Sequence, residues 1–158
     1  MDSYKLMVFL HIIAVVVALG ATFALPFLQA FAERQGVAAT RLFLRFSLRL
    51  DTILVTPGAI LVAVFGVGLI FDDHTGYKDD FPVWLMAAIV WFAAALIVDW
   101  VVMRPLTRSG IAALDGLADG PELPAAYEPL GKRGQMIGGL LGLSVIGIAL
   151  LMVWKPGE

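Results

Sequence analysis

Four long runs of apolar residues, separated by shorter polar segments, dominate this sequence. They extend over about residues 6–31, 52–71, 82–103 and 136–154. Each has close to the ~20 residues that a helix needs to cross ~30 Å of hydrocarbon. Because no water reaches backbone groups inside a bilayer, each run is predicted to be helical. The pattern therefore predicts an all-α membrane protein, with residues 1–158 forming a single domain, a four-transmembrane-helix bundle.

The first run is also too long for the core of a signal peptide, which has about 7–15 apolar residues. We therefore expect it to remain as an uncleaved span. Composition agrees with a membrane protein, since 60% of the residues are hydrophobic, 15% are charged and the mean hydropathy is +0.90. A soluble domain averages about 45–50% apolar and about 25% charged residues. The expected partner is therefore the lipid bilayer, which would cover the apolar side chains that one small core cannot bury.

Basic residues gather in two of the three connections. These residues are Arg34, Arg41, Arg45 and Arg49 in the first connection, and Arg104, Arg108, Lys132 and Arg133 in residues 104–135. The opposite side has Lys5, Lys78 and Lys155. Because lysine and arginine favour cytoplasmic loops, loop 104–135 is predicted to be cytoplasmic, with the N and C termini outside. We expect a multi-pass protein of the bacterial cytoplasmic (inner) membrane.

The net charge of −2 offers no basic excess for phosphates and argues against a nucleic-acid partner. The absence of cysteine excludes disulfides, thiolate metal sites and iron–sulfur clusters. Nucleotide-binding loops, a Ser-His-Asp set, the HExxH motif and paired catalytic carboxylates are missing from the sequence. We therefore expect no enzyme, but an accessory or scaffold subunit of a larger membrane complex, or a self-associating protein.

His11 interrupts the apolar stretch MVFLHIIAVVVALG at residues 7–20. Met7 precedes it by one turn, and His74 and Met86 lie near the outer ends of other segments. Together these side chains are candidate ligands for copper or for haem b. We favour a different interpretation, in which a neutral imidazole bonds to a neighbouring helix. Either role requires His11 to face the bundle interior, because hydrocarbon would leave the ring unsatisfied.

Glycines recur in the last run, where Gly134, Gly138 and Gly142 are four residues apart and share one helical face. Such a face lets another helix backbone approach closely. We expect it to pack within the chain in preference to forming a dimer contact. Gly20 is a further predicted packing position.

Two acidic residues, Asp51 and Asp99, lie near the cytoplasmic ends of the second and third runs. A carboxylate at such depth is costly unless it is paired, and a proton or ion relay is one interpretation. We favour an ion pair at headgroup level with Arg45, Arg49 or Arg104. Because neither carboxylate falls in the middle of a run, a small-solute permease is the least favoured function.

The segment RLFLRFSLRLD at 41–51 places Arg41, Arg45 and Arg49 on one helical face. It is predicted to extend the second span among anionic headgroups, with a partner-docking surface as the alternative.

A short helix is expected near residues 109–118. In the second span, Pro57 should cause a kink in which the Thr56 hydroxyl bonds a freed carbonyl.

The opening run, with its early His11, Gly20 nine residues later, and Thr56–Pro57 in the second span, resembles a known family. This family is DUF2269, small bacterial four-helix integral membrane proteins of unknown function. More distantly, the chain is similar to CopD-like membrane proteins, which are associated with copper handling and with haem-linked enzymes. That resemblance implies a ligand role for His11, although this chain lacks the further intramembrane histidine of those relatives.

Overall fold

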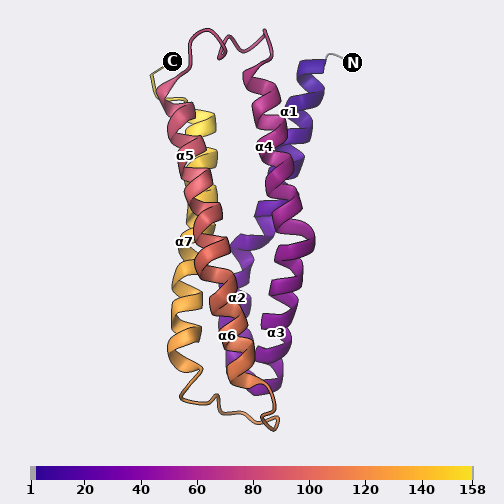
Figure 1. Ribbon diagram of the computed structural model, residues 1–158, viewed down its shortest axis with the longest axis vertical. Helices are drawn as coiled ribbons and strands as arrows, with labels where there is room; N and C mark the ends of the chain where they lie inside the picture. The colour runs from indigo at the N-terminus through magenta and orange to yellow at the C-terminus, as the bar shows by residue number, and fades with distance from the viewer. Residues whose placement is uncertain (1–2, 158) are drawn as a thin grey trace.

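Four long helical rods make up the computed structural model, which describes residues 3–157 (Figure 1). The rods are Ser3–Arg34, Val37–Ile70, Val83–Leu114 and Glu128–Trp154, and each is long and apolar enough to cross a membrane. Their segments are α1 (Ser3–Ala14), η1 (Val15–Leu19), α2 (Gly20–Arg34), α3 (Val37–Leu50), η2 (Asp51–Val55), α4 (Thr56–Ile70), α5 (Val83–Val98), η3 (Asp99–Met103), α6 (Arg104–Leu114) and α7 (Glu128–Trp154). The predicted all-α four-helix bundle is confirmed.

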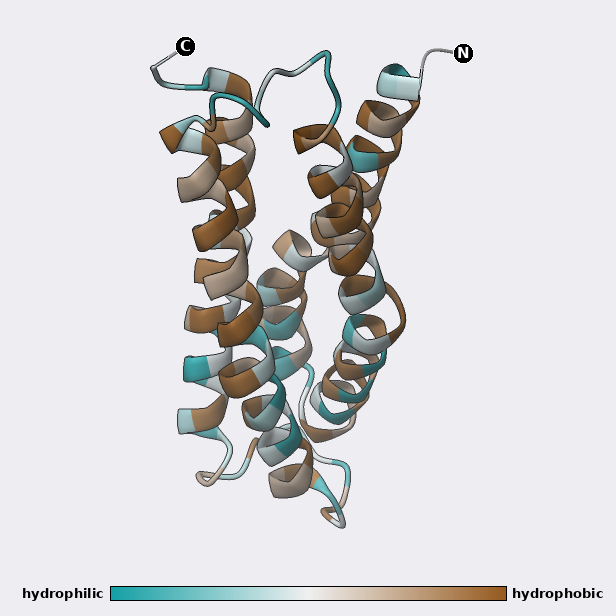
Figure 2. Cartoon of the chain, turned by 45° about the horizontal axis from the view of Figure 1, so that its top comes forward, coloured by the Kyte–Doolittle hydropathy of each residue, from teal (hydrophilic) through white to brown (hydrophobic). Residues whose placement is uncertain are grey.

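The rods alternate in direction, so the two ends of the chain lie at the same end of the bundle (Figure 1). We call this the terminal end. We call the opposite end, which carries the first and third connections, the arginine-rich end. Hydrophobic residues dominate the terminal half, and polar residues become frequent toward the arginine-rich end (Figure 2). Many large apolar side chains face outward, including Ile53, Val83 and Val153, as expected of a surface covered by lipid.

The rods are longer than the predicted spans, at 27 to 34 residues, or about 40–50 Å at 1.5 Å per residue. The connection predicted over 104–135 is more helical than expected, because α6 continues the third rod and α7 begins at Glu128. The short helix expected near 109–118 is the end of that third rod. It persists because one of its faces, with Thr107, Gly110 and Leu114, is buried.

Two helix pairs form the terminal half, since α1 packs on α4 and α5 packs on α7. In the other half, contacts of α2 with α7 and α3, and of α3 with α6, join the four rods. A hydrophobic core of Val37, Leu44, Leu114 and Tyr127 lies there. The rods are therefore held together most firmly toward the arginine-rich end.

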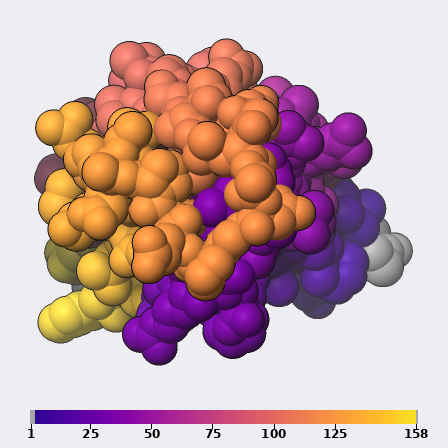
Figure 3. All heavy atoms as spheres, turned by 90° about the horizontal axis from the view of Figure 1, so that it is seen from below, coloured from indigo at the N-terminus to yellow at the C-terminus, as the bar shows by residue number. Residues whose placement is uncertain are grey.

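Two arginines of α3 bind the connection 115–127 instead of extending freely among headgroups. Arg41 Nη2 lies 2.5 Å from Asp119 Oδ1, and Arg45 Nη2 lies 2.5 Å from Asp115 Oδ1. The backbone N–H of Val37 also donates to the Gly120 carbonyl, at 2.9 Å. Figure 3 shows this connection, in orange, crossing the beginning of α3. Arg41 and Arg45 therefore fasten this connection to α3.

The glycine face of α7 lies against α2 of the same chain. A Cβ added at Gly134, Gly138 or Gly142 would lie 3.2–3.4 Å from atoms of Gln29, Pro26 or Phe23, respectively. Such close approach leaves little room for larger side chains and seats α2 closely on α7.

Gly20 does not pack in this way, and its prediction was wrong. It is exposed, and nothing lies within 4 Å of an added Cβ. The reason is helical periodicity, because Gln29 follows Gly20 by nine positions, which is about two and a half turns of the helix. Gly20 therefore lies on the opposite side of the helix from Gln29.

Replacing Gly142 with leucine should destabilise the bundle by about 1–3 kcal/mol, because the side chain must push α2 away. The matched control is Gly139→Leu on the same helix, where an added Cβ meets nothing within 4 Å. Thermal unfolding in mild detergent measures both variants. Equal melting temperatures for the two would contradict the assignment of this face to intrachain packing.

Candidate functional site

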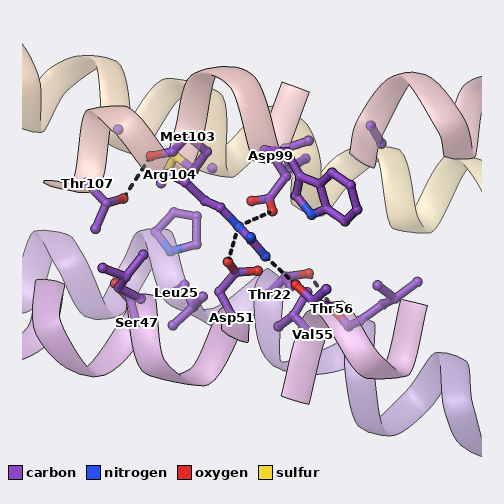
Figure 4. Close-up of a pocket in the computed structure, with 18 of the residues that line it drawn as sticks. Thr22, Leu25, Ser47, Asp51, Val55, Thr56, Asp99, Met103, Arg104 and Thr107 are labelled. Carbon is purple, nitrogen blue, oxygen red and sulfur yellow. Dashed lines mark hydrogen bonds and ion pairs between the residues drawn. The ribbon is translucent and has the colours of Figure 1, made fainter. Parts of the chain in front are cut away.

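A cavity of about 120 Å³ lies between the four rods, and residues of every rod line it (Figure 4). Most of its wall is apolar, with Leu19, Phe92 and Leu141 among the lining residues. Asp51, Asp99, Arg104 and Thr56 also line it. Ionisable groups inside an apolar membrane bundle are costly and mark functional sites, so this cavity is the candidate site.

Asp51, Asp99 and Arg104, which we call the charge cluster, meet at the cavity wall. Arg104 Nε lies 2.5 Å from Asp51 Oδ2 and 3.6 Å from Asp99 Oδ2. Arg104 Nη2 donates a hydrogen bond to the Thr56 hydroxyl. The guanidinium carbon also lies 5.5 Å from the ring centroid of Trp100, within range of a cation–π contact. Figure 4 shows the arginine pointing between the two carboxylates.

The three charged side chains are largely withdrawn from the surface, with 13% of Asp51, 20% of Asp99 and 21% of Arg104 exposed. Of the three predicted partners, Arg104 forms the ion pair, and Arg45 binds Asp115 instead. The cluster lies between the rods, near the middle of the second and third rods.

Each aspartate begins a π-helical segment, Asp51–Val55 or Asp99–Met103, and each segment precedes a proline near the start of the next helix. Proline lacks the N–H that an α-helix needs, so the turn before it relaxes its hydrogen bonding. Such π-helical turns often occur at functional sites. The Thr56 hydroxyl, next to Pro57, accepts a hydrogen bond from Arg104.

The charge cluster has one more negative than positive charge when all three groups are ionised. In addition, Asp51 Oδ1, Asp51 Oδ2 and Arg104 Nε are buried and form no hydrogen bond among the described residues, although Oδ2 and Nε lie 2.5 Å apart as an ion pair. A buried carboxylate oxygen accepts hydrogen bonds, and leaving it without a donor costs free energy. The site therefore favours a proton, a cation or a hydrogen-bond donor beside Asp51.

A second polar network closes the cavity toward the arginine-rich end. The carboxylate of Glu33 accepts hydrogen bonds from Tyr127 Oη at 2.8 Å, Gln29 Nε2 at 2.9 Å and Gln135 Nε2 at 2.5 Å. Gln29 and Gly134 line both the cavity and a smaller pocket beside Tyr127. Burial, together with the Glu33 carboxylate as its acceptor, raises the pKa of Tyr127. This tyrosine is therefore a stable hydrogen-bond donor.

Sequence reasoning missed this network. Only Gln29 and Glu33 could have indicated it in the sequence. They are polar, are four residues apart in the largely apolar first rod, and therefore share a helical face. Tyr127 and Gln135 gave no such signal, because they lie about 100 residues away in the sequence.

The predicted ligand His11 contacts a neighbouring helix. Its Nδ1 lies 3.1 Å from the carbonyl oxygen of Val62 on α4, and the ring packs beside Gly66. Met7, one turn earlier, packs beside Gly68 of the same helix. The structure therefore directs His11 toward α4, as predicted.

The other candidate ligands lie elsewhere. His74 stacks on Tyr4, with ring centroids 5.4 Å apart, and its Nδ1 lies 2.7 Å from Asp72 Oδ1. Hydrogen bonds from His74 lower the pKa of Asp72. Met86, on α5, is 53% exposed.

These positions do not fit a haem held by His11 and His74. Seven residues separate Tyr4, on which His74 stacks, from His11, or about 10 Å along the helix. Two nitrogen ligands of one metal ion lie within roughly 4 Å of each other, since each bond is about 2 Å long. Among the described residues, no group of three His, Asp or Glu side chains is placed to hold a metal ion.

Removing the cation of the charge cluster with Arg104→Met should destabilise the protein by about 3–5 kcal/mol, because two buried carboxylates lose their partner. Arg108→Met, one turn later on an exposed position, is the matched control and should stay within about 0.5 kcal/mol of wild type. Thermal unfolding in detergent compares them. An Arg104→Met protein as stable as the control would show that the cluster contributes nothing to the fold.

Comparison with known proteins agrees with the four apolar rods described above. The sequence model of one family, described as "Predicted integral membrane protein (DUF2269)", matches residues 5–156. No match was found among curated proteins or among solved structures. Because the match covers nearly the whole chain, the protein belongs to the DUF2269 family of predicted integral membrane proteins.

Proposed function

We propose that this integral membrane protein is not an enzyme and that it binds a small ligand with a protonated amine in its central cavity. One observation carries the proposal, namely that two carboxylates share one guanidinium inside an otherwise apolar cavity. An amine supplies both things that the cluster lacks, a positive charge and a hydrogen-bond donor for Asp51 Oδ1. The apolar walls would cover the rest of the ligand.

The size of the cavity suggests a suitable probe. Its volume of about 120 Å³ is close to that of an engineered apolar cavity of about 150 Å³ that binds benzene. Benzylamine combines one such ring with an ammonium group, and toluene has nearly the same shape without the charge. The pair therefore separates recognition of the amine from simple filling of the cavity.

Benzylamine should raise the melting temperature of the purified protein in mild detergent at pH 7, and toluene should have less effect. Asp51→Asn and Asp99→Asn should each weaken benzylamine binding at least tenfold in calorimetric titration, because a cluster with one carboxylate is already neutralised by Arg104. Asp79→Asn makes the same charge change in the exposed connection 71–82 and should bind like wild type.

Equal stabilisation by benzylamine and toluene would overturn the proposal, as would unchanged binding in both cluster variants. If benzylamine fails to bind the wild type between pH 6 and pH 8, a proton alone satisfies the cluster and the proposal is also wrong.

An accessory or scaffold subunit of a larger membrane complex is the second candidate function. Phe23, Phe27 and Phe31 form a ridge along one face of α2, and 44%, 68% and 64% of their surfaces are exposed. Aromatic side chains are enriched where proteins bind one another. This ridge offers a surface to a partner helix as well as to lipid.

A stoichiometric partner should copurify in mild detergent if this second candidate is correct, and Phe27→Ala should reduce its recovery. Phe9→Ala, an exposed phenylalanine on α1, is the control and should leave recovery unchanged. A monodisperse single chain with no partner would rule out this function.

Localisation and orientation are part of the proposal. The arginine-rich end carries most of the basic residues, which supports its placement in the cytoplasm with both termini outside. The bacterial cytoplasmic membrane is the expected location.

A further inference from the structure

We infer that the amine ligand is a single-chain amphiphile, whose hydrocarbon tail lies between the two helix pairs of the terminal half. This inference rests on the proposed function, because it places the amine at the charge cluster. It adds the chemical class of the rest of the ligand and the direction from which the ligand enters.

The cavity is elongated along the bundle. On α7 its lining extends from Gly134 to Ile148, fourteen residues that span about 21 Å of helix. A volume of about 120 Å³ distributed over such a length leaves a narrow space. A narrow, long space fits one flexible chain better than a lipid with two acyl chains.

Polarity changes along this length. The charge cluster and Gln29 lie in the half nearer the arginine-rich end, whereas Leu19, Phe92, Val145 and Ile148 line the part nearer the terminal end. An amphiphile with its ammonium group at Asp51 would therefore direct its tail toward the terminal end. There the tail would meet apolar side chains, and each buried methylene contributes about 0.8 kcal/mol.

Entry from the bilayer follows from the packing of the rods. In the terminal half, α1 packs on α4 and α5 packs on α7, and the two pairs diverge in both ribbon views (Figures 1 and 2). Toward the arginine-rich end, the hydrogen bonds of Glu33 with Tyr127 and Gln135 close the bundle. The tail would reach the cavity by passing between the pairs from the surrounding lipid.

The test uses the full-length protein and dodecylamine with a photoactivatable diazirine at the end of its tail. After irradiation, mass spectrometry should locate saturable labelling on α5 near Phe92 and on α7 near Val145 and Ile148. Excess unlabelled dodecylamine should compete, whereas dodecane should not. In a competition series, each added methylene of an alkylamine should improve apparent affinity about fourfold, after subtraction of partition into the detergent.

A matched pair of variants tests the position of the tail. Ile148→Trp fills the lined part of the cavity and should reduce saturable labelling at least tenfold, whereas Ile146→Trp lies on the exposed face of the same helix and should not. Both variants should still bind benzylamine, because position 148 is distant along the bundle from the charge cluster.

The outcomes separate the two proposals. Benzylamine binding with labelling that is unsaturable, or confined to exposed residues such as Ile146, overturns the tail assignment alone. Equal labelling of Ile148→Trp and Ile146→Trp also overturns the tail assignment alone. Loss of binding by both benzylamine and dodecylamine overturns the proposed function, and the tail assignment with it.

Discussion

The ion pair between Arg104 and Asp51 is the interaction on which the arrangement of this protein depends. Removing a guanidinium and a carboxylate from water costs several kcal/mol for each ion, and attraction between the two charges in close contact offsets this cost. Here the contact is 2.5 Å long, and it joins the second rod to the third. Thr56 and Trp100 hold the same guanidinium from two further directions. The two rods therefore have a defined register at their midpoints, where apolar packing alone would permit sliding.

The same contact explains why the cavity and the unusual backbone occur together. Asp51 and Asp99 each begin a π-helical segment, so the backbone departs from α-helical geometry where the charges enter the bundle. The small residues of α7 bring α2 close on the other side, and the Glu33 network fastens the arginine-rich end. With that end fastened, the charge cluster lies at the wall of a cavity that residues of all four rods line. This arrangement underlies both proposals on its function.

The sequence was sufficient to predict the fold, because span length and the requirement to satisfy backbone groups in lipid leave few alternatives. It also predicted that His11 faces a neighbouring helix and that the last run has a glycine face. Rod length was underestimated, because the amphipathic segments α3 and α6 are stabilised by packing on each other, which hydropathy alone does not report. Gly20 was misassigned since a lone glycine carries no information about which face is packed.

The candidate site was predictable only in part. Arg104 was among the predicted partners of the aspartates, but the cavity depends on distances between rods that no local pattern encodes. The Glu33 network escaped prediction for the same reason, since Tyr127 and Gln135 approach Gln29 and Glu33 only in the folded chain.

The most direct test of the central claim is a double-mutant cycle between positions 51 and 104. It compares the unfolding free energies of wild type, Asp51→Asn, Arg104→Gln and the double variant in one detergent. If the ion pair sets the register of the second and third rods, the cycle gives a coupling energy of about 1–3 kcal/mol. Additive effects, with a coupling energy near zero, would contradict the account.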